Sequence, residues 1–506
     1  MAVSSTRSLA CLLALSAVTT AATAFAQAPA TIRLGYLHSG NALADTYALE
    51  RVLVEPLPWP GNLAHHLDTT NRSQNMVEVV DAHTGEMLYS RGFSTVFGEW
   101  RTTDEAGKIS CGFHESVRFP AQGKPVRVRI LQRDERDLFP VVWSVEVDAG
   151  APEVIRKQGP APARLTPIRV SGPSAQKVDL LILGDGHTGA DMEKFEHDAR
   201  RTADHLFKVS PFRERAADFN VWAMAVPTQQ SGVSRPSTGV HHAFALGARY
   251  DIFGSERYVL TLDNRALRDI AQYAPYEFIE ILVNNDTYGG GGIFGQFSTA
   301  AAGNDWAACL FVHEFGHRFA GLADEYYTSP VAYQSSGARR EPWEPNVTAL
   351  RDPAGLKWKY HVAPGTPLPT PWPKAQYEAA SRAYQARRSA LRAANRPVSE
   401  MSALFREDLA RSNALLSTAP QRRATGAFEG ANYEVSGFCR PQMQCIMFDR
   451  SGTFCKVCED AITTIIDLYA PRGVGGSAGG VNRVCFPDDA QAVFFQARVA
   501  DMIVTT

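Results

Sequence analysis

The pattern of hydrophobic and polar positions divides the chain into two parts. In the first part the apolar positions form short alternating runs between turn residues, as at residues 76–80, 126–131 and 141–147. Alternation with a period of two is typical of strands that bury one face. No helical apolar stripe of useful length interrupts these runs. The pattern predicts an N-terminal all-β sandwich over residues 31–150.

The second part has the pattern of an α/β domain. Residues 151–175 are rich in proline and are expected to form a linker. Beyond them, nearly continuous apolar runs predict strands that are covered on both faces. These runs alternate with stretches of helical length, which indicates an α/β layer. The expected strands are residues 178–183, 219–226 and 278–284, the expected helices are 191–208, 264–273 and one from about 306, and the expected domain is 176–475, followed by a C-terminal extension at 476–506.

A helical insertion is predicted within this domain, at about residues 374–417. Tyr377, Tyr384 and Leu391 recur every seven residues, with arginine-rich faces between them. Pro397 ends this first helix, and Ser399 is a candidate cap for the second. We therefore expect an antiparallel helical hairpin whose charged faces are solvated.

The first 26 residues have the features of a secretory signal peptide. Arg7 precedes an apolar run, and Ala24-Phe25-Ala26 fits the small-x-small cleavage pattern. No later stretch approaches the roughly 18 apolar residues of a membrane-spanning helix. We expect a mature protein that starts at Gln27, has no membrane span and is secreted or periplasmic.

The charge balance narrows the class of partner. The chain has 51 Lys and Arg against 53 Asp and Glu, a formal net charge of −2. This balance argues against a protein that binds nucleic acid through a basic surface. The sequence gives no indication of the oligomeric state.

Cysteine usage points to cross-links near the C-terminal end of the domain. Of eight cysteines, Cys11 would leave with the signal peptide, and at least one of the remaining seven must be a free thiol, with Cys309 and Cys111 as candidates. In an oxidising compartment disulfides are favoured over a structural zinc site, and the spacing leaves their connectivity open. The clustered cysteines are Cys439, Cys445, Cys455 and Cys458.

Residues 313–317 form the motif H-E-x-x-H, which carries the candidate chemistry. On an α-helix, residues four apart lie one turn apart on one face, so His313 and His317 can bind one Zn²⁺ ion. Glu314 would lie beside that ion and can take a proton from its water molecule. The motif predicts one catalytic zinc ion with Glu314 as the general base.

The residues after the motif supply candidates for a third ligand. Gly321 is suited to end the helix, because glycine accepts the left-handed conformation of a helix C-terminus. The glycine and the acidic residue come one position later than in the metzincin pattern H-E-x-x-H-x-x-G-x-x-H/D. Asp324 is favoured over Glu325 as the ligand, and the other carboxylate would orient a histidine. Three protein ligands leave a fourth position open, which is the catalytic arrangement.

The sequence resembles the IgA-peptidase family of secreted bacterial zinc metallopeptidases over nearly all of the mature chain. The most specific stretch is HEFGHRFAGLADEYY at residues 313–327. The resemblance implies a metzincin-like zincin domain behind a β-rich N-terminal domain. It also implies hydrolysis of peptide bonds at one zinc ion, with His313, His317 and Asp324 as ligands and Glu314 as general base. Other shared segments are residues 59–62, 89–93, 97–100, 114–116, 184–186, 253–258, 288–290, 426–430, 445–447 and 454–458.

Two methionines are candidates for the Met-turn of a metzincin-like fold. Met447 is expected beneath the zinc site, with Met443 as its rival. A core methionine without such a role is the plainer alternative.

A glycine run suggests where a substrate would bind. Gly290 and Gly291 precede residues 297–302, which are expected to be the edge strand above the cleft. An extended peptide can pair with such an edge through main-chain hydrogen bonds. Tyr326 or Tyr327 is a candidate for stabilising the oxyanion, and either can equally be a core residue.

The predicted function is that of a secreted zinc-dependent endopeptidase with a polypeptide substrate. Two alternatives remain at this level: a surface-binding, adhesin-type protein with a vestigial zinc unit, and a zinc amidase that acts on a non-peptide linkage. The intact H-E-x-x-H motif with its acidic follow-up favours the enzyme.

Overall fold

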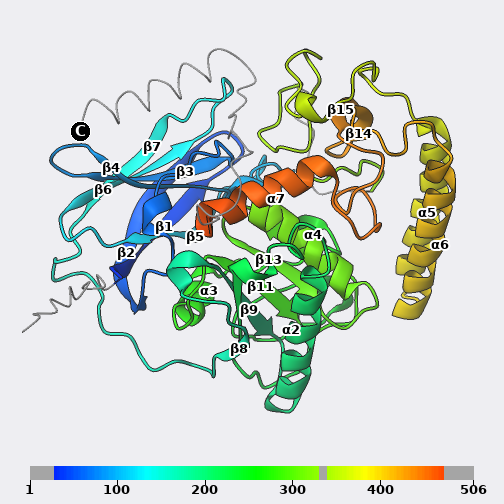
Figure 1. The fold of residues 1–506 in the computed structure, drawn as a ribbon. Helices are drawn as coiled ribbons and strands as arrows, with labels where there is room; N and C mark the ends of the chain where they lie inside the picture. Colours follow the sequence, from blue (N-terminus) through cyan, green and yellow to red (C-terminus); the bar gives the residue numbers. More distant parts are fainter. Residues whose placement is uncertain (1–27, 330–338, 472–506) are drawn as a thin grey trace, which may run out of the picture.

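The computed structural model describes residues 28–329 and 339–471 (Figure 1). The predicted signal peptide and the predicted C-terminal extension lie outside the described residues. Among the helices that are described, we find none with both the length and the apolar character needed to cross a bilayer.

The N-terminal part is β-rich, as the alternating pattern predicts. A three-stranded antiparallel sheet in the order β2–β1–β5 faces a four-stranded antiparallel sheet in the order β4–β3–β6–β7. Side chains of both sheets, among them Ile32, Val79 and Phe119, form one core. The strands are β1 (Ala30–Gly40), β2 (Asp45–Pro58), β3 (Asn75–Asp81), β4 (Met87–Phe93), β5 (Cys111–Pro120), β6 (Val126–Gln132) and β7 (Val141–Val147).

A short helix, α1 (Val96–Trp100), joins this sandwich to the rest of the protein. The sequence pattern does not reveal it, because five residues are too few to display a helical period. Thr95 caps the helix by accepting a hydrogen bond from the N–H of Gly98. Phe97 and Trp100 pack into a core that also contains side chains of α3 and of the sheet in the second part of the protein. The two parts therefore share one buried core.

The second part is built on a six-stranded mixed sheet in the order β12–β13–β11–β9–β10–β8. The four central strands are parallel, and both edge strands, β8 and β12, run antiparallel to their neighbours. Every residue of β9 is buried, which agrees with its continuous apolar sequence. The strands are β8 (Thr166–Arg169), β9 (Val178–Asp185), β10 (Phe219–Ala225), β11 (Phe278–Val283), β12 (Gly290–Ile293) and β13 (Phe297–Ala301).

Two expectations about this sheet are corrected. The predicted linker contains β8, which pairs with β10 as an edge strand. The strand expected at the other edge, β13, lies inside the sheet between β11 and β12. The glycine run itself forms the edge strand β12, although glycine has a low intrinsic preference for strands.

Helices cover both faces of the sheet (Figure 1). One face packs against α2 (Met192–Leu206), α4 (Ala307–Ala320) and α7 (Lys456–Tyr469). The other face packs against α3 (Asn264–Ala271) and the N-terminal α1. The candidate motif lies on α4, which contacts β12 and β13.

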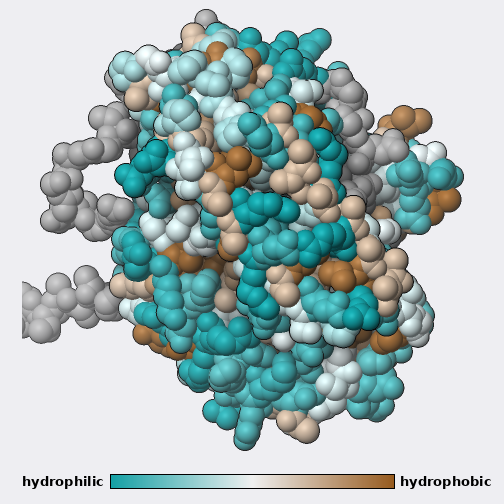
Figure 2. All heavy atoms as spheres, turned by 90° about the vertical axis from the view of Figure 1, so that its right-hand side faces the viewer, coloured by the Kyte–Doolittle hydropathy of each residue, from teal (hydrophilic) through white to brown (hydrophobic). Residues whose placement is uncertain are grey.

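The predicted helical hairpin is present as α5 (Lys374–Ala393) and α6 (Val398–Ser417), which lie side by side (Figure 1). Ser399 lies inside α6 and does not cap it, since Pro397 precedes the first helical residue. The face of the molecule that carries the hairpin is largely hydrophilic (Figure 2). Arg388 is an exception to the expected solvated face, because it turns inward and is buried. A small hairpin, β14 (Phe428–Ala431) and β15 (Glu434–Arg440), follows.

Candidate metal centre

Three side chains converge at the C-terminal half of α4. His313 Nε2 lies 3.2 Å from His317 Nε2, and Asp324 Oδ1 lies 3.1 Å and 3.3 Å from these two atoms. Two N or O ligands that are each about 2.0–2.1 Å from a tetrahedral ion are about 3.3 Å apart. The triangle therefore has the size that one zinc-like ion requires, and these three residues are a candidate ligand set.

Main-chain carbonyls hold both imidazoles in one orientation. His313 lies with Nδ1 2.8 Å from the carbonyl oxygen of Ile446, and His317 with Nδ1 2.6 Å from that of Leu322. Each ring donates its Nδ1–H to the carbonyl, because a carbonyl can only accept. The lone pair of Nε2 is then free to bind a cation, which is the usual arrangement of a histidine ligand.

The turn after α4 brings Asp324 back towards the histidines. Gly321 ends the helix in the left-handed region, with φ 63° and ψ 38°, as the sequence predicts. A Cβ atom at this position would lie 2.6 Å from the ring of Trp343. Both the conformation and the neighbouring ring therefore require glycine here.

Asp324 is held from a distant part of the chain. Its side chain is buried, and its Oδ2 accepts a hydrogen bond from the hydroxyl of Tyr433, in the turn between β14 and β15. The N–H of Asn432 donates to the carbonyl of Asp324 over 3.0 Å. Burial acts to raise the pKa of Asp324, but His317 and His313 hold it well below its usual range. The carboxylate is thus kept ionised beside the imidazoles.

The side chain of Glu314 lies between the motif helix α4 and the edge strand β12. It is only 8% exposed. Burial raises its pKa, while His313 and His317 act in the opposite direction. A Cβ atom at Gly290 would lie 3.0 Å from Cγ of Glu314 and 2.6 Å from the carbonyl of Thr299. The absence of a side chain at Gly290 lets β12 lie directly against Glu314.

The three candidate ligands and Glu314 line one cavity of about 540 Å³. Its walls come from widely separated parts of the sequence. The first is α1 with its flanks, the second is the edge strand β12, and the third is the turn between β14 and β15. Residues that line it include Ser94, Gly98, Glu99, Thr102, Arg257, Gly290, Gly291, Gly292, Tyr326 and Tyr433.

The two candidate tyrosines differ in position. Tyr326 lines the cavity, its ring lies roughly parallel to that of His313, and its hydroxyl accepts a hydrogen bond of 2.9 Å from Arg257. Tyr327 is buried, and its hydroxyl lies 3.3 Å from Glu378 on α5. Of the pair, Tyr326 is the one that faces the site.

Met447 lies beneath α4. Its sulfur is 3.1 Å from the position of a Cβ atom at Gly316, and its carbonyl accepts a 2.9 Å hydrogen bond from the N–H of Glu325. Met443 is buried in the same core. Of the two candidate methionines, Met447 is the one in contact with the motif helix.

The cysteines differ from the prediction. The described residues contain six free cysteines and no disulfide. Cys445 Sγ lies 3.7 Å from Cys458 Sγ, whereas a disulfide bond is about 2.05 Å long. Glu325 lies with these two thiols and Cys455, so it does not orient a histidine, and Cys439 is outside the group on β15. The thiols are spread around a carboxylate and are not paired with each other.

Sequence reasoning missed the residues that support the site from a distance. Tyr433 belongs to no motif, and residues 97–100 of α1 are marked only as a segment shared with the family; the roles of both depend on long-range packing. Arg257 lies in the segment 253–258, one of those shared with the family, which is the one signal that could have indicated it.

Two family models match the chain. The model described as IgA Peptidase M64 matches residues 166–466, more than half of the chain, and the one described as Peptidase M64 N-terminus matches residues 24–144. No curated protein matches. The first match spans the mixed sheet and the candidate metal centre, and the second spans nearly all of the β-rich part. The resemblance found in the sequence is thereby confirmed, and the chain belongs to the IgA peptidase M64 family of metallopeptidases.

Proposed function

We propose that this protein is a secreted or periplasmic zinc-dependent endopeptidase. His313, His317 and Asp324 would hold one zinc ion, and Glu314 would act as the general base. The observation that carries the proposal is the triangle of ligand atoms, with edges of 3.1–3.3 Å, on the wall of a cavity beside a buried carboxylate. Two imidazoles and one carboxylate with an open fourth position suit catalytic zinc.

The side chains around the triangle support peptide hydrolysis. A zinc ion at this site would polarise a water molecule and the carbonyl of the scissile bond. Glu314 lies where it can take the proton of the attacking water and then deliver it to the leaving amine. Tyr326, fixed by Arg257, can donate its hydroxyl proton to the developing oxyanion.

The edge strand β12 supports the binding of an extended peptide. The N–H of Gly290 donates to Arg257 (3.0 Å), and its carbonyl accepts from Val259 (3.2 Å), so this residue is already paired on its outer side. Because main-chain groups alternate along a strand, Gly292 presents its N–H and C=O on the same outer side. The free edge for a substrate therefore begins at Gly292, while Gly290 and Gly291 line the cavity beside it.

Several features support a metzincin-like arrangement. An antiparallel edge strand borders the cavity, the motif helix ends at a left-handed glycine, and Met447 lies beneath that helix. We further propose that residues 1–26 direct export. N-terminal sequencing of the protein recovered from the culture medium or periplasm should then begin at Gln27.

A cleavage assay tests the function. The purified protein should cleave a proteome-derived peptide library at internal bonds, lose this activity with a zinc chelator and regain it with added Zn²⁺. If the peptides stay intact while a non-peptide amide is cleaved, the result would favour the amidase. A metal-loaded protein that cleaves neither, but binds a surface ligand, would favour the adhesin.

A further inference from the structure

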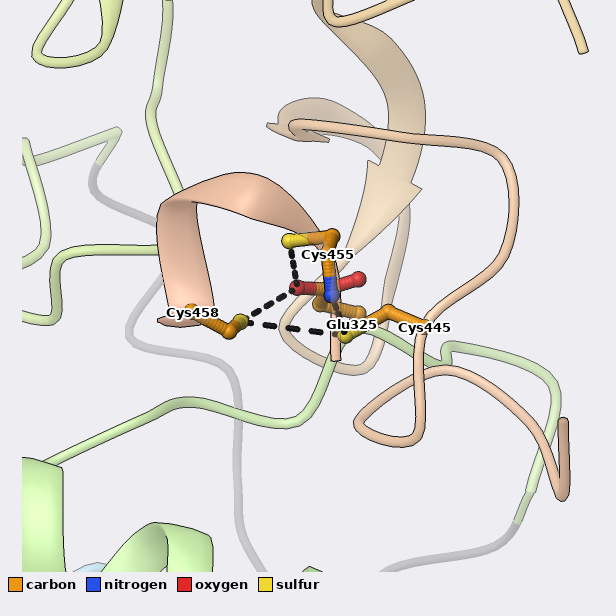
Figure 3. Close-up of side chains that lie close together, drawn as sticks. All are labelled: Glu325, Cys445, Cys455 and Cys458. Atoms are coloured by element: carbon orange, nitrogen blue, oxygen red, sulfur yellow. Dashed lines mark hydrogen bonds between the residues drawn. The ribbon is translucent and has the colours of Figure 1, made fainter. Parts of the chain in front are cut away.

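A second group of ligand-type side chains lies in the core, apart from the cavity. Glu325, Cys445, Cys455 and Cys458 are all buried, and one potential ligand atom from each lies within 4.8 Å of the others. Figure 3 shows the carboxylate of Glu325 directed into the space between the three thiols. The thiols come from the Cys445 loop and the start of α7.

Three distances within this group are close to those of a tetrahedral zinc site, and all four ligand atoms lie within 4.8 Å of one another. With Zn–S of about 2.3 Å and Zn–O of about 2.0 Å, tetrahedral ligands are about 3.8 Å apart for two sulfurs and about 3.5 Å for sulfur and oxygen. Cys445 Sγ lies 3.7 Å from Cys458 Sγ. Oε1 of Glu325 lies 3.5 Å from Cys458 Sγ and 3.9 Å from Cys455 Sγ.

Among the residues that the structure describes, no cationic side chain lies within bonding distance of the Glu325 carboxylate. Glu325 is fully buried, and its Oε2 has no hydrogen-bond partner among the described residues. Asn346 donates to Oε1 over 3.0 Å, whereas the nearby Arg440 donates to the main-chain carbonyls of Gly430 and Met443. An uncompensated buried charge is costly, and a bound cation would remove that cost.

The backbone around the thiols is suited to stabilise thiolates. Cys455 immediately precedes α7, and Cys458 lies in its first turn, where the helix dipole favours negative charge. The N–H of Cys455 also donates to Cys445 Sγ over 3.3 Å. A disulfide between two of these cysteines would use neither the carboxylate nor the third thiol.

We propose that Glu325, Cys445, Cys455 and Cys458 bind a second, structural zinc ion. Four protein ligands close the coordination sphere, which distinguishes this site from the three-ligand centre. The ion would tie together three segments: the residue next to Asp324, the segment whose Ile446 carbonyl orients His313, and the start of α7. The proposal does not depend on peptidase activity.

Metal counting on the purified full chain tests this proposal. We expect two zinc ions per chain in the parent and one in the His313→Ala/His317→Ala variant. We expect one in Cys455→Ser/Cys458→Ser, and two in the matched control Cys439→Ser, which removes a buried cysteine outside the group. One ion in the parent and none in His313→Ala/His317→Ala would overturn the proposal.

A spectroscopic measurement keeps the test decisive if the cysteine variant fails to fold. The His313→Ala/His317→Ala variant, loaded with Co²⁺ in place of zinc, retains all cysteines. It should display a thiolate-to-cobalt charge-transfer band and the visible bands of tetrahedral cobalt. A featureless spectrum, or peptide mapping that recovers a Cys445–Cys458 disulfide, would refute the site.

Discussion

The hydroxyl of Tyr433 donates a hydrogen bond to Oδ2 of Asp324, the carboxylate oxygen that does not face the two histidines. This contact joins the turn between β14 and β15 to the candidate ligand. It fixes the direction in which Asp324 presents Oδ1.

Replacing Tyr433 with phenylalanine should weaken metal binding at this centre. Partners that orient a metal ligand contribute about 10–100-fold to affinity or activity. We expect Tyr433→Phe to fold and to lower zinc affinity in this range, as measured by competition with a chelator. Tyr360→Phe, at a tyrosine that is 65% exposed, is the matched control. If the parent, Tyr433→Phe and Tyr360→Phe had equal zinc affinities, the role assigned to Tyr433 would be contradicted.

Replacing Glu314 with glutamine should separate metal binding from hydrolysis. The variant loses the proton acceptor but keeps the three candidate ligands, so zinc content should be unchanged. Activity on a peptide substrate should fall by about 10²–10⁴-fold, the usual contribution of general acid–base catalysis. Glu153→Gln, at an exposed glutamate, is the control. Near-parental activity of Glu314→Gln would exclude this residue as the base.

Replacing Gly290 with alanine should displace the edge strand. The added methyl group would meet the carbonyl of Thr299 at 2.6 Å and Cγ of Glu314 at 3.0 Å. Overpacking of this kind costs about 1–3 kcal/mol of stability. We expect a lower urea midpoint and lower activity, whereas Gly159→Ala, which meets no atom within 4 Å, should behave like the parent. An unchanged midpoint for Gly290→Ala would show that β12 can move at no cost.

The pH dependence of stability should carry a contribution from His187. This imidazole is buried, neither ring nitrogen has a hydrogen-bond partner among the described residues, and burial, with Lys194 as a smaller cause, lowers its pKa to about 4. The unfolded chain takes up a proton near pH 6.5, but the folded protein does not. Folding stability from this group is therefore present above pH 6.5 and is lost as the pH falls towards 4, by about 3 kcal/mol.

The measurement compares the free energy of unfolding of His187→Phe and the parent between pH 7 and 4. The difference between the two proteins should change by about this amount over the range. His197→Phe, at a histidine whose side chain is 76% exposed, should follow the parent curve. Parallel curves for His187→Phe and the parent would contradict the assignment.

The parts of the site that follow local rules could be predicted from the sequence. The four-residue spacing of His313 and His317 and the helix end at Gly321 depend on helical geometry alone. Asp324 could be predicted as the third ligand because it lies close to that turn in the sequence. These features need no knowledge of the tertiary fold, and the structure brings the three side chains together.

The remaining parts depend on contacts between distant segments. The glycine run has a low intrinsic preference for strands, yet it pairs with β13 and forms β12. Thr299 and Glu314 leave no room there for a side chain at Gly290. Spacing suggested that Cys439 would join the other cysteines, but β15 carries it elsewhere. Glu325 takes that place, since adjacent carboxylates on an extended segment point in different directions.

One wall of the cavity is supplied by α1, which belongs to the β-rich part, while the candidate ligands come from the part that follows. A proteolytic event that shed the first 150 residues would not unmask the catalytic unit in the way that loss of a propeptide does. It would remove one wall of the cavity and leave the hydrophobic partners of Phe97 and Trp100 facing water. The protein should therefore keep both parts in its active form.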